Sequence, residues 1–330
     1  MTAQAATLDG PRIVSRGSIA RSRRWALYTS YFFLLLFAVF FLTPPYYQLA
    51  TATKTSEQIS NQNTDPWLPA LSSSAQGINP GGANAGKASL AVKQGHSWLP
   101  AAVNGFLANL DDLWNGTDFP IYFRNSAIVT VCVVAITMLI SVPAAFSLGR
   151  MKFWGSGILA TGVFLTYLVP DSLLFIPLFK VVGALGLLNS YWGLVLVYPT
   201  LTVPFCTWIM IGYFQSIPKE LDEAALIDGA NHVQMLFKIF IPVALPGLIA
   251  ATIFAFTVSW AEFVYPMAFI YSSSQLVLTA GTITSLVKAD VYQWGMIMTA
   301  ALLAAAPPLV IYAFLMDFYI AGLTAGATKG

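Results

Sequence analysis

The sequence predicts an all-α, polytopic membrane protein with six transmembrane helices, because of its composition and its six long apolar segments. Of the 330 residues, 57% are hydrophobic and 9% are charged, and a mean hydropathy of +0.70 excludes an ordinary soluble globule. A helix needs about 20 apolar residues to cross roughly 30 Å of hydrocarbon. Segments of that length are Trp25–Leu49, Asn125–Leu148, Ile158–Phe179, Trp192–Phe214, Leu245–Ile270 and Trp294–Met316. Because these apolar runs are continuous rather than alternating, they indicate helices.

The basic residues predict that both chain termini lie in the cytoplasm. By the positive-inside rule, short loops rich in Lys and Arg face the cytoplasm. The residues that set this orientation are Arg12, Arg16, Arg21, Arg23, Arg24, Arg150, Lys152, Lys219, Lys238 and Lys329. Residues 1–24 and 317–330 are therefore expected to be cytoplasmic. The apolar core of the first span is longer than the roughly 7–15 residues of a signal peptide, so we expect the span to be retained.

Residues 50–124 form a long loop that we expect on the outer side. Its part from Ser72 to Ser97 is rich in Gly, Ser and Asn and predicts a flexible loop, whereas residues 98–114 have the spacing of an amphipathic helix. Within the loop, Gly81–Ala88 matches the phosphate-binding pattern GxxxxGK, but Ala88 replaces the Ser or Thr that binds Mg²⁺, and no strand precedes the motif. We therefore expect no cofactor in this chain.

The segment from Glu220 to Gly247 concentrates charge between two apolar spans. It holds four of the fourteen acidic residues, namely Glu220, Asp222, Glu223 and Asp228. We expect one helix capped by Ser216, a turn at Gly229, and a second helix. The second helix would present one apolar face, made of Val233, Leu236, Phe237 and Phe240. From the residues alone, this segment is either an amphipathic element lying on the inner membrane surface or a docking site.

The motifs of this segment resemble the EAA loop of ABC-importer permeases. They are Glu223-Ala224-Ala225, Asp228-Gly229-Ala230, Ile241-Pro242 and Pro246-Gly247. The resemblance implies a transmembrane type-1 domain over residues 125–316, with the EAA loop at 216–246. It also implies that a separate ATPase docks there, with Glu223 making a charge pair, Ala224 and Ala225 packing closely, and Gly229 setting the turn. Asp228 is expected to cap the second helix.

Other stretches are similar to the smaller, six-span subunit of the maltose-type carbohydrate permeases. They are Asn125-Ser126, Gly183–Asn189, Trp260-Ala261-Glu262-Phe263 and the tail Ala321–Gly330. The resemblance implies a type I ABC-importer permease fold in the bacterial inner membrane, and a sugar, oligosaccharide or polyol as cargo. The implied partners are a second permease in a heterodimer, an ATP-binding subunit dimer that holds ATP and Mg²⁺, and an extracytoplasmic solute-binding protein. Ala261 departs from the Asn usual in the family, so a polar role is missing there.

Ionisable residues within the spans are candidate functional residues, because a charge in lipid costs about 2.5–3.5 kcal/mol on insertion scales. Glu262 lies near Trp260 and Tyr265, a combination that either lines the translocation path or braces the helices against the partner permease. We favour bracing, because the resemblance places most sugar contacts in the other permease. Asp171 follows Pro170, where a helix break either opens a polar pocket or simply bends the span.

Two other functions compete with the importer. A secondary transporter needs coupling-ion sites near the membrane midplane, and it would leave the EAA loop unexplained. A membrane-embedded enzyme would need a catalytic motif, and neither HExxH, GxSxG nor a cluster of the two histidines occurs. Cys132 and Cys206 lack metal-ligand spacing, so no metal site is expected. The net charge of +2 gives no reason to expect nucleic acid as a partner, and lipid is the expected surrounding.

Overall fold

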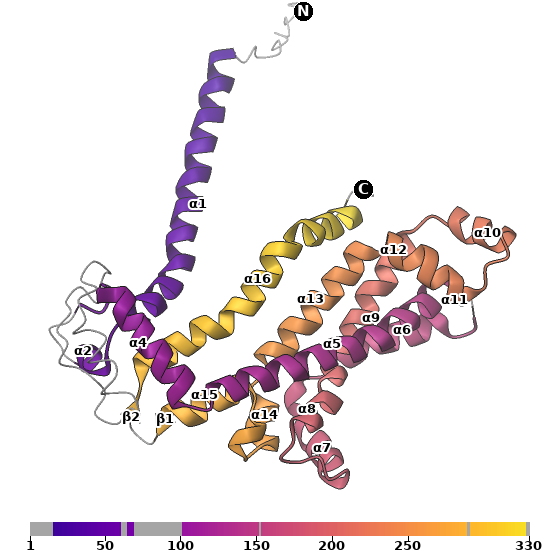
Figure 1. Ribbon diagram of the computed structural model, residues 1–330. Helices are drawn as coiled ribbons and strands as arrows, with labels where there is room; N and C mark the ends of the chain where they lie inside the picture. The colour runs from indigo at the N-terminus through magenta and orange to yellow at the C-terminus, as the bar shows by residue number, and fades with distance from the viewer. Residues whose placement is uncertain (1–15, 61–64, 69–100, 152, 289–290, 328–330) are drawn as a thin grey trace, which may run out of the picture.

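The computed structural model describes residues 16–60, 65–68, 101–151, 153–288 and 291–327 (Figure 1). The chain is helical, as the sequence predicts, apart from one small antiparallel hairpin of β1 (Val287–Lys288) and β2 (Val291–Tyr292) within the described residues. The phosphate-binding look-alike at Gly81–Ala88 lies outside the described residues, as do residues 1–15.

The helices fall into a long and a short group. The long ones are α1 (Arg16–Ala52), α5 (Phe119–Arg150), α9 (Pro199–Ser216), α13 (Leu245–Ala261) and α16 (Trp294–Ala327). The short ones are α2 (Ser56–Ser60), α4 (Ala101–Gly116), α6 (Ser156–Tyr167), α7 (Asp171–Ala184), α8 (Tyr191–Val197), α10 (Glu220–Ile227), α11 (His232–Met235), α12 (Ile241–Val243), α14 (Val264–Phe269) and α15 (Leu278–Leu286). A π-helical turn covers Leu236–Phe240, and a 3-10 turn covers Ser273–Gln275.

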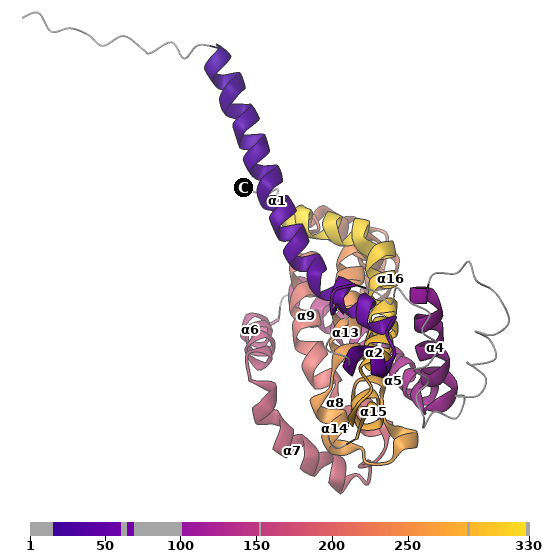
Figure 2. The same cartoon turned by 90° about the vertical axis from the view of Figure 1, so that its left-hand side faces the viewer.

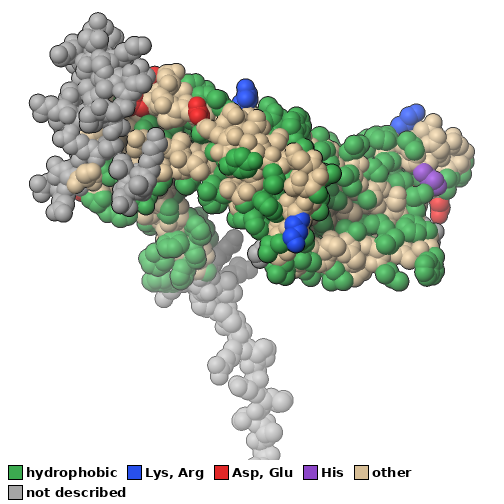
Figure 3. All heavy atoms as spheres, turned by 90° about the horizontal axis from the view of Figure 1, so that it is seen from below, with side chains coloured by type: hydrophobic (Ala, Val, Ile, Leu, Met, Phe, Trp, Pro, Cys, Tyr) green, Lys and Arg blue, Asp and Glu red, His purple; other side chains and the backbone are tan. Residues whose placement is uncertain are grey.

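Four helical stretches of the described chain are long and apolar enough to cross a membrane. They are Arg24–Ala52, Phe119–Arg150, Tyr191–Ser216 and Trp294–Leu315. The pair His232–Val243 and Leu245–Ala261, bent by 83°, makes a fifth if it is counted as one span. Figure 3 shows a face covered mainly by hydrophobic side chains, with few charged ones, which suits a lipid environment.

Three of the predicted spans are divided between two helices. Trp192–Phe214 is divided at Tyr198 into α8 and α9, although the two together still form one apolar stretch long enough to cross a membrane. Ile158–Phe179 is divided into α6 and α7, because Pro170 has no amide hydrogen and adopts an extended ψ of 130°. Leu245–Ile270 is divided after Ala261 into α13 and α14. The division at Pro170 agrees with the helix break expected there, whereas the division after Ala261 was not expected, and the count of six crossings stays a prediction.

Helices α5, α9 and α13 pack against one another and form the centre of the bundle. One buried apolar cluster, with Tyr122, Tyr198 and Tyr265, lies toward α14 and α15, and a second, with Phe214 and Phe240, lies toward α10. Between α5 and α9, Thr137 and Thr202 share a hydrogen bond of 2.6 Å and are both fully buried. Their hydroxyls are therefore paired where water is absent.

Polar side chains of α5 hold the segment that leads into α15. Asn125 is fully buried, and its Nδ2 donates to the carbonyls of Ser274 (3.0 Å) and Leu276 (2.9 Å). The hydroxyl of Ser126 accepts the amide hydrogen of Leu278 at 2.8 Å. The Asn125-Ser126 pair thus satisfies backbone groups that no helix would satisfy.

Helix α1 leans away from the bundle and joins it at one end, as the two perpendicular views show (Figures 1 and 2). Beyond that end, the Lys54 side chain is buried, and its Nζ donates to the carbonyls of Asp65 (2.7 Å) and Pro66 (3.0 Å). Burial lowers the pKa of Lys54, although the Asp65 carboxylate opposes this effect. Asn109 of α4 donates from Nδ2 to the carbonyl of Lys54 at 3.0 Å.

The approach of α4 to the end of α1 depends on Gly105. A Cβ atom at Gly105 would lie 1.9 Å from the carbonyl oxygen of Thr53, a backbone atom that cannot turn aside. We predict that Gly105→Ala lowers the free energy of unfolding by about 1–3 kcal/mol, as overpacking commonly does. Gly116→Ala in the same helix is the control, because a Cβ there meets nothing within 4 Å. Equal thermal-unfolding midpoints for the two variants in detergent would contradict this prediction.

Candidate functional site

The polar loop begins with α10, whose first turn carries Glu220, Asp222 and Glu223. Negative side chains are favourable there, because the unpaired amide groups give a helix N-terminus partial positive charge. Ser216 was expected to cap this helix, and this prediction was wrong. Ser216 lies in the last turn of α9, and its hydroxyl donates to the carbonyl of Tyr213 at 2.8 Å. The extended backbone at Ile217, with a ψ of 133°, separates Ser216 from α10.

The turn after α10 is built on Gly229. This residue has a φ of +77°, which side chains other than that of Gly rarely adopt. A Cβ there would meet nothing within 4 Å, so the need for Gly is conformational rather than steric. The amide of Ala230 then donates to the carbonyl of Ala225 at 2.9 Å and closes the end of α10.

Asn231, and not Asp228, caps the second helix. The Oδ1 atom of Asn231 accepts the amide hydrogen of Gln234 at 2.8 Å, and the Oε1 atom of Gln234 accepts that of Asn231 at 3.0 Å. This reciprocal pair is a capping box. The expectation for Asp228 was wrong because Asp228 ends α10 instead, with helical φ and ψ of −73° and 0°. The signal in the sequence was Asn followed three residues later by Gln.

The four apolar residues expected on one face of the second helix lie on two faces. Leu236 and Phe240 are buried, whereas the exposed fractions of Val233 and Phe237 are 64% and 61%. Residues four apart lie on the same side of a helix, so Leu236 and Phe240 share the side that faces the bundle, whereas Val233 and Phe237 share the neighbouring side, which is exposed. The ring of Phe240 then packs at 5.1 Å from that of Phe146 and 5.9 Å from that of Phe214, measured between centroids.

Both helices of the loop therefore expose apolar side chains. They are Leu226 and Ile227 on α10 and Val233 and Phe237 on the second helix, all more than half exposed. Glu223 and Ala224, which belong to α10, are also exposed. Ala225 is buried against the bundle, so of the two alanines expected to pack against a partner, Ala224 alone is accessible. Exposed apolar residues beside acidic ones are typical of a protein-binding surface.

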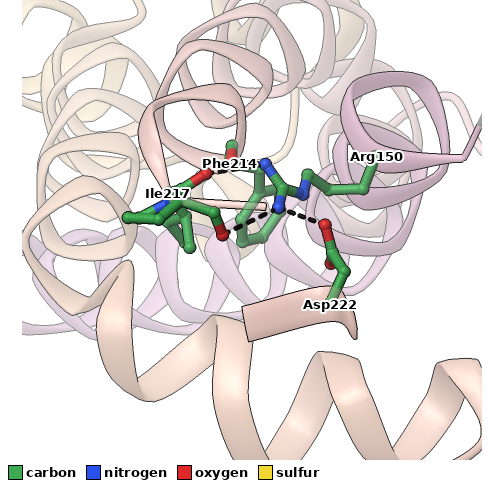
Figure 4. A network of polar contacts seen from close by, with 5 residues as sticks. Arg150, Phe214, Ile217 and Asp222 are labelled. Atoms are coloured by element: carbon green, nitrogen blue, oxygen red, sulfur yellow. Dashed lines mark hydrogen bonds and ion pairs between the residues drawn. The ribbon is translucent and has the colours of Figure 1, made fainter. Parts of the chain in front are cut away.

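Arg150, at the end of α5, joins this loop to the bundle (Figure 4). Its Nη1 donates to the carbonyls of Phe214 (3.2 Å) and Ile217 (2.8 Å). Its Nη2 donates to the carbonyl of Pro218 (3.2 Å) and forms an ion pair with the carboxylate of Asp222. The guanidinium carbon also lies 5.0 Å from the ring centroid of Phe240. Sequence reasoning used Arg150 only as an orientation signal and missed these contacts.

The polar candidates within the spans connect helices of this chain. The Oε1 atom of Glu262 accepts the amide hydrogens of Val264 (2.8 Å) and Tyr265 (3.3 Å), so it holds the start of α14. The hydroxyl of Tyr265 donates to the carbonyl of Asp171 at 3.2 Å and joins α14 to α7. The Nε1 atom of Trp260 donates to the carbonyl of Ala304 at 2.9 Å and joins α13 to α16. Asp171 itself is exposed at the start of α7.

Comparison with known proteins gives the family. Residues 141–324, more than half of the chain, match the model of the binding-protein-dependent transport system inner membrane component. The chain belongs to this family. The match includes the whole polar loop and Arg150, together with the break at Glu262. The protein is accordingly a permease subunit of an ABC transporter, a multi-pass protein of the cytoplasmic membrane and not itself an enzyme.

Individual relatives agree with this assignment. The inner membrane ABC transporter permease protein YcjP of Escherichia coli is 34% identical over 221 residues, which cover 66% of this chain and 79% of that protein. The trehalose/maltose transport system permease protein MalG of Thermococcus litoralis is 35% identical over 213 residues, which cover 64% and 76%. The crystal structure of a bacterial ABC transporter involved in the import of alginate contains a chain of the same fold, with a TM-score of 0.70, 19% identity, and coverage of 93% of this chain and 99% of that one.

The capping box yields a test of the loop. We predict that Asn231→Ala destabilises α11 by about 0.5–2 kcal/mol. The amide hydrogen of Gln234 loses its acceptor, and the Gln234 side chain is no longer paired with the side chain of residue 231. The backbone amides of α11 should then exchange with deuterium about 2- to 30-fold faster under native conditions. Asp228→Ala is the control and should leave those rates unchanged. Faster exchange in the Asp228 variant alone would show that the cap has been assigned to the wrong residue.

Proposed function

We propose that this chain is a permease subunit of an ATP-driven importer that moves a sugar, oligosaccharide or polyol across the cytoplasmic membrane. The observation that carries the proposal is the exposed surface of the polar loop, with Glu223 and Ala224 beside the apolar residues Leu226, Ile227, Val233 and Phe237. The proposed topology has six crossings with both termini in the cytoplasm, and α10 on the cytoplasmic side.

A separate ATPase fits this surface better than lipid does. The first turn of α10 carries three carboxylates, which a membrane interface of anionic lipids would repel. A protein can bury the apolar residues and pair the charge of Glu223 at once. In the proposed complex, an ATPase dimer binds ATP and Mg²⁺ and moves the loop, a second permease completes the path in a heterodimer, and a solute-binding protein delivers cargo outside.

The choice of a carbohydrate cargo rests on the relatives. One relative is a trehalose/maltose permease, and another, 32% identical over 235 residues of this chain, is the sulfoquinovosyl glycerol permease SmoH of Agrobacterium fabrum. The solutes in both names are rich in hydroxyl groups. The particular solute is best identified by binding measurements on the solute-binding protein that co-purifies with this chain.

Ion-gradient transport receives less support from the candidate residues. A coupling-ion site needs carboxylate oxygens that are free to bind and release a cation. One oxygen of Glu262 already accepts two amide hydrogens of α14, and Asp171 lies at the exposed start of α7. Within this chain Glu262 holds the start of α14, and its bracing against the partner permease stays a prediction.

The test is uptake by the whole complex. The tagged chain would be purified from its native membranes with its bound partners and reconstituted in liposomes with the solute-binding protein. We expect radiolabelled sugar to accumulate when ATP is inside the liposomes and no ion gradient is imposed. Uptake that ignores ATP but follows a proton or sodium gradient would refute the importer.

Charge reversal at the loop gives a sharper prediction. Glu223→Lys should lower ATP-driven uptake by roughly tenfold or more, because a like charge at a protein interface costs several kcal/mol. Glu220→Lys, the same change one turn earlier on α10, should have a smaller effect. Gly229→Pro should also abolish uptake, because proline cannot adopt the φ of +77°. Full uptake by both Glu223→Lys and Gly229→Pro would contradict the role given to the loop.

A further inference from the structure

We propose that Arg150 is the positioning residue that transmits the movement of α10 to the transmembrane helices. This inference rests on the proposed function, because it names the path by which the docked ATPase would move the bundle. It differs from docking itself, since the Arg150 side chain is buried and is not among the exposed residues of the loop.

Arg150 contacts each element that would have to move together. It belongs to α5, it binds two carbonyls at the end of α9 and one in the connection to α10, and it pairs with Asp222 of α10. Its guanidinium also lies over the ring of Phe240, which comes from the π-helical turn after α11. One side chain therefore connects both ends of the loop to helices α5 and α9.

Few other side chains of α10 hold it to the bundle. Of its eight residues, all within the described part of the chain, Ala225 is the one that is buried. A helix attached by one small apolar contact would rock on the bundle when a partner pushed it. The ion pair opposes this rocking, because the Arg150 side chain is 6% exposed and that of Asp222 is 24% exposed, so water screens it weakly.

The contacts require arginine rather than a positive charge alone. The planar guanidinium presents several donors in fixed directions, and here they reach three carbonyls and a carboxylate while the plane faces a ring. A lysine ammonium has three donors at a single atom and no plane to stack. Arg150→Lys should therefore keep the charge but lose the rigid connection.

The test separates docking from transmission in the reconstituted complex. Three quantities are measured: the amount of ATPase that co-purifies, the rate of ATP hydrolysis, and the number of solute molecules taken up per ATP. For Arg150→Met we expect unchanged co-purification and continuing hydrolysis, with uptake per ATP lower by about tenfold, within the usual range of coupling between sites. Stimulation of hydrolysis by the loaded solute-binding protein should be lost as well.

Graded variants and a matched control accompany this measurement. Arg150→Lys and Asp222→Asn should fall between wild type and Arg150→Met, and they serve if Arg150→Met fails to fold. Lys180→Met removes an exposed positive charge on α7, outside the polar loop, and should keep the wild-type ratio. Hydrogen exchange of α10 in the same complexes should accelerate in the Arg150 and Asp222 variants and not in the control.

Three results overturn the inference. An unchanged ratio of uptake to ATP in all the Arg150 and Asp222 variants would mean that the contact transmits nothing. If co-purification, hydrolysis and uptake all fell equally while the uptake per ATP stayed unchanged, Arg150 would have only a structural role. If wild-type uptake did not depend on ATP, the proposed function would fail first, and this inference with it.

Discussion

Every break in a membrane helix leaves backbone amides and carbonyls that lipid cannot satisfy, and this constraint accounts for the contacts of several polar side chains at the breaks in this protein. Glu262 accepts two amide hydrogens where α13 gives way to α14. Asn125 donates to two carbonyls in the segment before α15. Arg150 donates to three carbonyls at and just after the end of α9, those of Phe214, Ile217 and Pro218. Polar residues thus mark the places where the fold departs from straight helices.

The same residues link structure to transport. A permease must change the relative positions of its helices, and broken helices allow this more readily than straight ones. The side chains at the breaks decide which helices move together. Glu262 and Tyr265 connect α14 with its neighbours, whereas Arg150 connects the loop with α5 and α9. Within this scheme, a charged residue in a span need not touch the cargo to be important for its passage.

The sequence predicts the helical class and the position of the polar loop well, because both depend on composition and local motifs. The break at Pro170 is likewise a local signal and is predicted, because proline has no amide hydrogen. The capping box of Asn231 and Gln234 is also local, but the prediction placed the cap at Asp228. The hydrogen bonds of Arg150 could not be predicted from the sequence, since the residues that accept them lie 64 to 72 positions further along the chain. The side of the second helix that is buried is set by the packing of Phe240 against Phe146 and Phe214, which no local pattern reveals.

Helix α1 has a consequence for how the protein is made. The most apolar 18-residue stretch of its membrane span has no residue buried in the fold, and its backbone groups are satisfied within the helix. It therefore needs nothing from the rest of the chain to be stable in lipid. During synthesis it can enter the membrane and remain there as an independent unit before the first residue of α5 has left the ribosome. The bundle then assembles beside a segment that is already inserted, and helix association follows helix insertion as a separate stage.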